Sequence, residues 1–151
     1  VTKVGTKIKD LKHPEKKMSK SEENPNGVIS LFDSEESIIK KIKGATTDSD
    51  NLVYFDEENK PGISNLLNIA SVMTSRTIND LEGEFKNSGY GTFKNYVAMV
   101  TSKKIGEIQS RYNELLNSKE VDEILNKGLD VSINLAKEKY ELVKEKVGLS
   151  D

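Results

Sequence analysis

The sequence predicts a mainly α-helical fold, a helical bundle preceded by the last strands of a truncated α/β domain. From residue 33 to the C-terminus, apolar residues recur every three or four positions, which is the period of amphipathic helices. Residues 1–32 carry short extended patterns instead, and two short strands cannot form a stable sheet by themselves. We therefore expect two parts, a remnant of a larger domain in residues 1–32 and a helical domain in residues 33–151.

Two short extended segments in the first part lie on either side of a lysine-rich turn. The first contains Val4, Ile8 and Leu11, which are separated by polar residues compatible with a strand. The second is the apolar run Val28-Ile29-Ser30-Leu31-Phe32, which follows the turn residues Asn26-Gly27. We expect both segments to be strands and the second one to be buried.

Three shorter helices are predicted from residues that favour helix ends. Ser, Thr and Asp accept the unpaired N–H groups of a first turn, proline suits the first helical position, and glycine favours a C-terminal end. The expected N-terminal residues are Asp33 or Ser34, Pro61, and Thr77 with Asp80 as a weak capping box. Gly44 is expected to end the first helix. Asn65, in the second, is a candidate for a bond to the preceding loop.

Two long helices complete the predicted bundle. One apolar stripe runs from Phe93 to Leu115. The other begins after Ser118 and follows the spacing of three and four residues up to Gly148. Two such stripes are expected to bury each other as an antiparallel pair.

The composition excludes several kinds of protein. Of the 151 residues 34% are hydrophobic and 32% are charged, and no apolar run approaches the roughly 20 residues that span a bilayer. The chain has no cysteine and one histidine, His13, which excludes disulfide frameworks, thiolate or histidine metal clusters and Ser-His-Asp triads. No metal site is predicted, and we expect a cytoplasmic location.

The charge is distributed unevenly along the chain. Residues 1–21 contain seven lysines against Asp10 and Glu15, whereas the whole chain has a net charge of -2. The excess of positive charge near the N-terminus favours anion binding there. The acidic remainder does not suggest a broad nucleic-acid surface, so any contact with RNA should be local.

The stretch Lys17-Met18-Ser19-Lys20-Ser21, called the lysine loop below, is the best candidate for chemistry. Two ammonium groups three residues apart in a loop can converge on one polyphosphate. A lysine that binds departing oxygens in the transition state contributes more to rate than to substrate affinity. Neither a Gly-x-x-x-x-Gly-Lys-Ser/Thr loop nor a Gly-x-Gly-x-x-Gly turn is present.

This pentapeptide resembles the signature loop of class I aminoacyl-tRNA synthetases, and further motifs are similar to bacterial tryptophanyl-tRNA synthetases. The similar blocks, in order, are Lys41-Ile42-Lys43, Thr47-Asp48-Ser49, Asn59-Lys60-Pro61-Gly62-Ile63-Ser64-Asn65-Leu66-Leu67, Gly89-Tyr90-Gly91-Thr92-Phe93-Lys94 and Val147-Gly148-Leu149. The resemblance implies an enzyme that activates tryptophan with ATP and Mg²⁺ and then attaches it to tRNA(Trp).

The same resemblance implies a role for each residue of the lysine loop. Lys17 and Lys20 would bind the ATP phosphates and stabilise the departing pyrophosphate. Ser19 and Ser21 would supply hydroxyl or backbone contacts, and Met18 would lie near the adenosine.

The family's adenine-binding motif, Rossmann-like core and tryptophan pocket precede the region seen here. The resemblance therefore implies a C-terminal part: the end of the catalytic domain in residues 1–32 and the anticodon-binding domain in residues 33–151. We expect this part to be inactive alone, to bind no ATP tightly and to be a monomer, although the family's complete enzymes are homodimers.

The family's helical domain recognises the tRNA anticodon, and unpaired bases are read by stacking and by hydrogen bonds. The candidate contacts are Thr47, Asp48, Ser49, Arg76, Tyr90, Lys94 and Arg111. Each also has a structural explanation; Arg111, for example, has Glu107 and Glu114 within helical reach.

Two alternatives remain at this point. The tyrosine enzyme shares the architecture, and the pocket that selects the amino acid is absent from this chain. A free-standing helical interaction module is the other alternative, but such a module should not begin with two strands that have unpaired edges.

Overall fold

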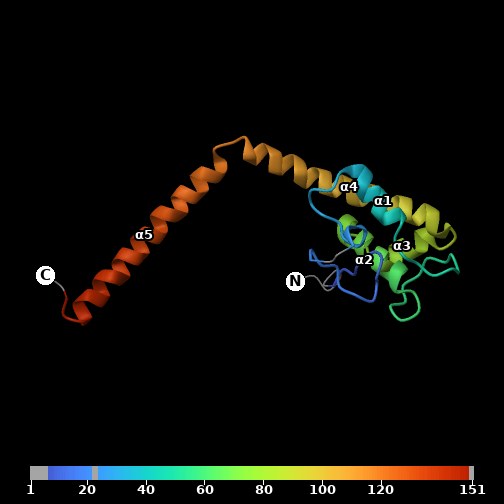
Figure 1. Ribbon diagram of the computed structural model, residues 1–151, viewed down its shortest axis with the longest axis horizontal. Coiled ribbons are helices and arrows are strands. Elements are labelled where there is room, and N and C mark those ends of the chain that lie inside the picture. The colour runs from blue at the N-terminus through green and yellow to red at the C-terminus, as the bar shows by residue number, and fades with distance from the viewer. Residues whose placement is uncertain (1–6, 22–23, 150–151) are drawn as a thin grey trace. The chain divides into compact units, whose positions relative to one another are not determined.

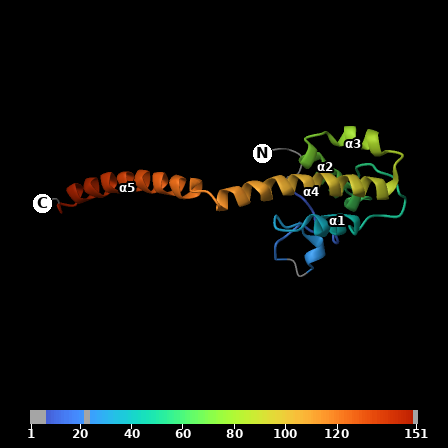
Figure 2. The same cartoon turned by 90° about the horizontal axis from the view of Figure 1, so that it is seen from above.

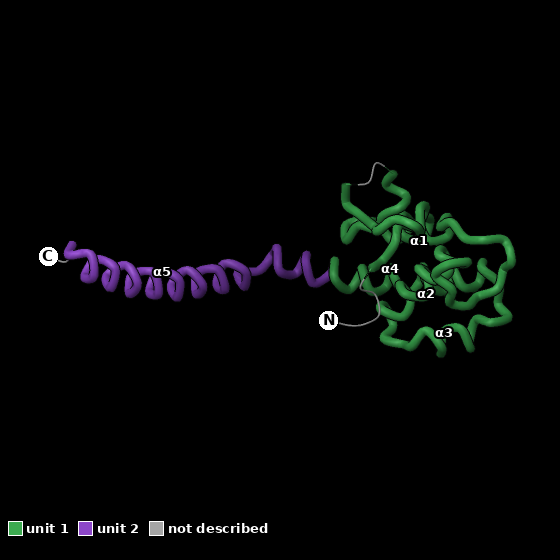
Figure 3. Tube along the Cα trace, turned by 90° about the horizontal axis from the view of Figure 1, so that it is seen from below, with its two compact units in different colours: residues 1–109 green, residues 110–151 purple. Residues whose placement is uncertain are grey.

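The structure is a computed structural model that describes residues 7–21 and 24–149, and it is mainly α-helical. It divides into two compact units, residues 1–109 and residues 110–151 (Figure 3). The elements are the 3-10 helix η1 (Pro25–Gly27) and the α-helices α1 (Glu35–Lys43), α2 (Pro61–Thr74), α3 (Ile78–Phe85), α4 (Gly89–Leu116) and α5 (Glu120–Lys146) (Figure 1). The predicted helical part of the fold is confirmed.

The caps of α1 and α3 form as predicted. The Ser34 hydroxyl accepts the Ser37 N–H, and the N–H of Gly44 closes the C-terminal end of α1 on the carbonyls of Lys40 and Ile42. In α3, Thr77 and Asp80 form a complete capping box. These side chains satisfy N–H groups that a helix terminus leaves without partners, so local sequence determines where both helices begin.

Helix α2 begins at Pro61, as predicted, and is buried over most of its length. Its residues from Gly62 to Leu67 are all buried, whatever direction they face on the helix. A helix surrounded in this way lies in the middle of a fold rather than on its surface. Helix α2 therefore serves as the axis of the first unit.

The first unit has one hydrophobic core, formed where α1, α2 and α3 gather around the first half of α4 (Figure 2). Fully buried side chains come from every one of these helices, for example Ile42, Leu66, Leu81 and Phe93. Leu11 of the N-terminal segment is 2% exposed and belongs to the same core. The N-terminal segment is thus packed on the helices.

The predicted strands do not form in the described part of the chain. Val4 lies outside the described residues, and only an isolated antiparallel bridge joins Lys9 to Lys17. The predicted buried strand 28–32 is wrong, since Leu31 and Phe32 are exposed.

A local turn replaces that strand. The Asp33 carboxylate accepts the Ser30 N–H (2.8 Å), and the Ser30 carbonyl accepts the Asp33 N–H (3.2 Å). Side chains rather than a neighbouring strand bond to peptide groups of this segment, since the Ser30 hydroxyl accepts the Phe32 N–H and the Gln109 amide donates to the Leu31 carbonyl (2.8 Å). The predicted division into a catalytic-domain remnant, residues 1–32, and a helical domain, residues 33–151, stays a prediction.

Helix α5 belongs to the second unit and is described by itself. Its ends agree with the prediction: the Ser118 hydroxyl accepts the Glu120 N–H, and Gly148 has a φ of 74° that ends the helix. None of its residues is buried; Leu125 is 64% exposed and Leu129 is 55% exposed. Within the second unit the predicted burial of this stripe does not occur, because residues 110–149 hold no other element besides the last turns of α4 for it to pack on. No described helix is both long and apolar enough to cross a membrane.

The start of α2 lies so close to the loop before it that adding one methyl group at Gly62 should destabilise the fold. A Cβ at Gly62 would overlap the carbonyl oxygen of Thr46, whereas a Cβ at Gly83 of α3 would meet no atom within 4 Å. We expect Gly62→Ala to lower the free energy of unfolding by about 1–3 kcal/mol. The control Gly83→Ala should raise it by about 0.5–1 kcal/mol through helix propensity. Urea denaturation of both variants measures the difference, and equal effects would contradict the close contact.

Candidate functional site

The lysine loop begins on a short two-stranded ribbon. Lys9 lies opposite Lys17 in the antiparallel bridge. Two backbone hydrogen bonds flank this pair, from the Asp10 N–H to the Lys16 carbonyl (3.0 Å) and from the Met18 N–H to the Ile8 carbonyl (3.0 Å). The backbone at the start of the loop is therefore fixed by pairing, and the loop continues from a defined point.

The side chains of the lysine loop differ in their surroundings. Met18 is partly buried and packs against the hydrophobic core. The Ser19 and Ser21 hydroxyls lie 3.0 Å apart, within hydrogen-bond distance. Lys17 and Lys20 are exposed, and neither forms an ion pair with a carboxylate in the described ranges 7–21 and 24–149. Their ammonium groups are available for an external anion, and the residues that follow, Glu22 and Glu23, lie outside the described part.

A buried amide of α2 holds the other side of this ribbon. The Asn65 side-chain oxygen accepts the Lys9 N–H, and the Asn65 amide nitrogen donates to the Lys9 carbonyl, both at 2.8 Å. Asn65 is only 3% exposed. The predicted bond from Asn65 to the loop before α2 is wrong, since both side-chain bonds go to Lys9, which lies 56 residues away in the segment that carries the lysine loop.

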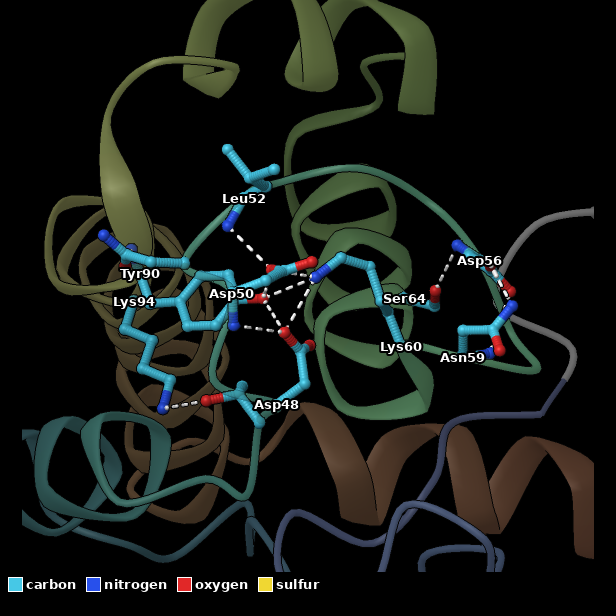
Figure 4. Close-up of polar contacts among 11 residues, drawn as sticks. Asp48, Asp50, Leu52, Asp56, Asn59, Lys60, Ser64, Tyr90 and Lys94 are labelled. Atoms are coloured by element: carbon cyan, nitrogen blue, oxygen red, sulfur yellow. Dashed lines mark hydrogen bonds and ion pairs between the residues drawn. The ribbon is translucent and has the colours of Figure 1, made fainter.

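A buried lysine organises the loop between α1 and α2. The Lys60 side chain is 2% exposed, and its ammonium group reaches between Asp48 and Asp50 with the Tyr90 ring beside them (Figure 4). It lies 2.8 Å from Asp48 Oδ1, is also paired with Asp50 Oδ1, and donates to the Tyr90 hydroxyl at 2.6 Å. The ammonium group is also 4.7 Å from the centre of the Tyr54 ring. Burial of a charge is tolerated here because several partners compensate it.

These contacts shift the pKa values of the cluster in consistent directions. Burial alone would lower the pKa of Lys60, but hydrogen bonds from its ammonium group to Asp48 and Asp50 raise it above the ordinary value. The hydrogen bond from Lys60 is the main reason that the pKa of Asp50 lies below its ordinary value. Burial and the neighbouring carboxylate of Asp48 raise the pKa of Tyr90. At neutral pH the cluster therefore holds a protonated Lys60, an ionised Asp50 and a neutral Tyr90 phenol.

Lys94 has a different environment from Lys60. Its ammonium group donates to the Ala45 carbonyl (2.8 Å) and to the Thr47 hydroxyl (3.1 Å), and it forms no ion pair with a carboxylate of the described residues. Lys12 donates to the adjacent carbonyl of Gly44. Burial and the positive charge of Lys12 both lower the pKa of Lys94. The structure thus places two lysine ammonium groups at neighbouring carbonyls.

The six predicted RNA contacts that belong to the first unit do not form one cluster. Asp48 and Tyr90 share Lys60, and Thr47 with Lys94 lies next to them. Ser49 is exposed in the same loop. Arg76 is not among these contacts, and Arg111 belongs to the second unit.

The two arginines are already paired with glutamates. Arg76 lies 2.6 Å from Glu84 and also donates to the Tyr96 hydroxyl. In the second unit, Arg111 donates to both carboxylate oxygens of Glu120 at 3.0 Å and also pairs with Glu114. These ion pairs raise the pKa of each arginine.

Sequence reasoning missed the roles of Lys60 and Tyr54. Lys60 enters the sequence analysis only as a member of the block 59–67, and Tyr54 is in none of the motifs. Tyr54 is 41% exposed and lines a hollow of about 480 Å³ between this loop and α3, with Leu52, Asn79, Glu82 and Lys86 among the other lining residues. A pairing between residues that are distant in the chain leaves no periodic signal in the sequence.

No group of three His, Cys, Asp or Glu side chains in the described ranges lies close enough together to hold a metal ion. The acidic side chains of the loop are instead engaged with Lys60.

Comparisons with known proteins agree with these motifs. The sequence model of the family tRNA synthetases class I (W and Y) matches residues 4–106. The chain is 47% identical over 150 residues to a tryptophan–tRNA ligase of Bacillus anthracis and 43% identical over 149 residues to that of Bacillus subtilis. Each match covers 99% of this chain but 46% and 45% of the relative, so the chain spans slightly less than half of their length.

Solved structures give the same result. The crystal structure of tryptophanyl-tRNA synthetase from Mycoplasma pneumoniae superposes with a TM-score of 0.80 at 33% identity and covers 99% of this chain and 47% of its own. The Campylobacter jejuni tryptophanyl-tRNA synthetase, solved with ADP and tryptophan, gives 0.67 at 30% identity over 95% of this chain and 44% of its own. The family match extends over more than half of the chain, and the resemblance predicted from its motifs is confirmed. The chain belongs to the class I tRNA synthetases of the tryptophan and tyrosine type.

Proposed function

We propose that the chain is the part of a tryptophan–tRNA ligase that contains the phosphate-binding lysine loop and the anticodon-binding helical domain. The complete enzyme would activate tryptophan with ATP and transfer it to tRNA(Trp) in the cytoplasm. The observation that carries this proposal is the lysine loop within a chain that tryptophan–tRNA ligases match over 99% of its length. The tyrosine enzyme is the weaker alternative, since the relatives described above are all tryptophan enzymes.

Lys17 and Lys20 would act on the phosphates of MgATP. When the tryptophan carboxylate attacks the α-phosphorus, the bond from that phosphorus to the α,β-bridging oxygen breaks and negative charge develops on the departing pyrophosphate. Two exposed ammonium groups without a described carboxylate partner are suited to neutralise that charge. Ser19 and Ser21 would add hydroxyl or N–H contacts, and Met18, held by the core, would place the loop near the adenosine.

The remaining reactants need the rest of the enzyme. We propose that residues 1–32 form the end of its catalytic domain and residues 33–151 its helical domain. The chain alone would be monomeric and inactive, because one loop cannot bind ATP, tryptophan and the tRNA end together. The complete enzyme would be a homodimer.

The loop at residues 46–50 is the best candidate for reading the anticodon. Lys60 fixes its shape through Asp48 and Asp50, and Ser49 is exposed on it. Lys94 lies beside this loop without a carboxylate partner in the described residues, so a phosphate or a base acceptor would bring it a favourable charge interaction.

Neighbouring groups would complete that contact. The Thr47 hydroxyl, which accepts from Lys94, would turn toward a base edge, and the exposed Tyr54 ring would provide a surface for stacking. Tyr90 would act through the loop's shape, since its hydroxyl is shared with Lys60. Arg76 and Arg111 remain candidates that would exchange a glutamate for RNA.

The first prediction concerns Lys20 in the complete enzyme that contains this segment. Lys20→Ala should reduce the rate of tryptophan-dependent ATP–pyrophosphate exchange by roughly 10- to 100-fold, because it removes a charge-assisted contact formed in the transition state. The affinity for tryptophan should stay nearly unchanged. Lys104→Ala, an exposed lysine of α4, is the control. An unaltered exchange rate would remove the phosphate-binding role of the loop.

The second prediction concerns RNA binding by the 151-residue chain itself. At fixed moderate salt we expect tRNA(Trp) to bind more tightly than the same tRNA with an altered anticodon, by about 1–3 kcal/mol per lost base contact. Lys94→Ala should weaken binding and reduce the slope of log K against log salt by about 0.7. The Lys104→Ala control should leave that slope unchanged. Equal affinities for both tRNAs would refute base recognition by this part alone.

The third prediction concerns the pH dependence of the Lys60 cluster. Because its pKa lies above the ordinary value, the stabilisation by Lys60 is complete below about pH 10 and is lost as the pH rises further. The pKa of Asp50 lies below its ordinary value, so its contribution is present above about pH 4 and is lost on acidification. Thermal unfolding midpoints measured from pH 2 to 11 should show both losses.

Substitution of the lysine tests the assignment. Lys60→Met should lower stability at neutral pH by about 1–3 kcal/mol, less than for a fully buried pair because Asp50 is 45% exposed. It should also flatten the decline above pH 10. Lys104→Met, which removes an exposed pair, should change neither. An alkaline decline of equal size in Lys60→Met would show that another group causes it.

A further inference from the structure

The two-stranded ribbon from which the lysine loop continues has an outer edge at Lys9 that no third strand of the described residues pairs with. This edge faces Asn65 of α2. The two backbone hydrogen bonds around the Lys9–Lys17 bridge come from residues next to the pair. Lys9 and Lys17 are therefore a non-hydrogen-bonded pair, in which the peptide groups of each residue point away from its partner. The N–H and carbonyl of Lys9 would thus need a further strand beyond the ribbon.

Asn65 provides the groups of that absent strand. Its carboxamide has one oxygen that accepts and one nitrogen that donates, as a neighbouring peptide would, and both bonds to Lys9 are 2.8 Å long. The side chain is 3% exposed, so water does not readily replace it. Because α2 is the buried axis of the first unit, this contact attaches the ribbon to a helix that is buried over most of its length.

Other contacts of the same segment do not duplicate this function. The Leu11 N–H bonds to the Gly27 carbonyl, and the Leu11 carbonyl accepts from Thr46, so these bonds act two residues further from the bridge. Asn65 alone, among the described residues, bonds to the peptide groups of the residue opposite Lys17. A change at Asn65 would thus move the ribbon at the point where the lysine loop begins.

We propose that Asn65 is a positioning residue for the lysine loop, acting through the Lys9 backbone on Lys17 and the residues that follow. This inference rests on the proposed function, because it assigns Asn65 to the same phosphate-binding loop. Both polar atoms of the Asn65 amide are bonded to Lys9, so the residue acts by holding the ribbon. It sets the place from which the loop reaches the phosphates, and a small displacement of a catalytic group has a large effect on rate.

The test compares Asn65→Ala and Asn65→Asp with Asn68→Ala in the complete enzyme that contains this segment. Asn68 lies one turn along α2 and forms no side-chain hydrogen bond with a described residue. We expect Asn65→Ala to lower kcat for tryptophan-dependent ATP–pyrophosphate exchange by roughly 10- to 100-fold with an unchanged KM for tryptophan. Asn68→Ala should stay within about twofold of the wild type.

Asn65→Asp gives a second readout if the alanine variant folds poorly. It keeps the acceptor for the Lys9 N–H but places a carboxylate oxygen against the Lys9 carbonyl, so its kcat should also fall while circular dichroism at the assay temperature stays that of the wild type. A wild-type kcat in a folded Asn65→Asp or Asn65→Ala enzyme would overturn the proposal.

A double-mutant cycle with Lys20→Ala separates positioning from general damage. If Asn65 acts through the loop, Asn65→Ala should reduce the rate by a smaller factor once Lys20 is absent, because only the part that acts through Lys17 and the other loop residues remains. If the two reductions multiply, Asn65 acts independently and the proposal is wrong. An unchanged rate in Lys20→Ala alone would refute the proposed function of the loop, whereas a slow Lys20→Ala with a normal Asn65→Ala would refute only this inference.

Discussion

The arrangement of the first unit depends on one constraint: the peptide groups of the short extended segment 8–12 must find hydrogen-bond partners outside a β-sheet. Five partners satisfy its peptide groups: the start of the lysine loop, the Gly27 carbonyl, Thr46, the Asp10 side chain and Asn65. A buried peptide group without a hydrogen bond raises the free energy of the folded state, so each of these contacts stabilises the position of its partner against the segment. The lysine loop, the end of α1 and the start of α2 are joined because they all complete the same backbone.

Electrostatics organises the loop that leads into α2. Lys60 immediately precedes α2 and holds two carboxylates and a phenol, which come from the loop before it and from α4. Asn65 follows five residues later and holds the N-terminal segment. One short stretch of chain therefore fixes both candidate sites, the loop proposed to bind phosphates and the loop proposed to read RNA. This arrangement explains, in structural terms, why Lys60 and Asn65 occur in the block of residues 59–67.

Local features were predictable from the sequence, whereas long-range pairing was not. Ser34, Pro61 and Thr77 mark the starts of three helices because capping involves residues at most a few positions apart. The strand predicted at 28–32 failed because a strand depends on a partner that the local pattern does not reveal.

The candidate sites divide in the same way. The lysine loop was found from its residues alone, since its chemistry lies in one contiguous stretch. The role of Lys60 was not, because its partners are 10, 12 and 30 residues away. The stripe of α5 has clear helical periodicity, but periodicity does not state what covers it, and Leu125 and Leu129 are exposed.

The burial of Lys60 also has a chemical consequence. Acylating reagents and acetyl-transferring enzymes attack a neutral amine that they can reach, and the Lys60 amine is 2% exposed, protonated and bound by three oxygens. Lys17 and Lys20, by contrast, present exposed amines on the same chain. Lys60 would react only in molecules whose loop at residues 46–50 has opened, so its modification would measure how often residues 46–50 open. Lys17 and Lys20 would react in either state of residues 46–50.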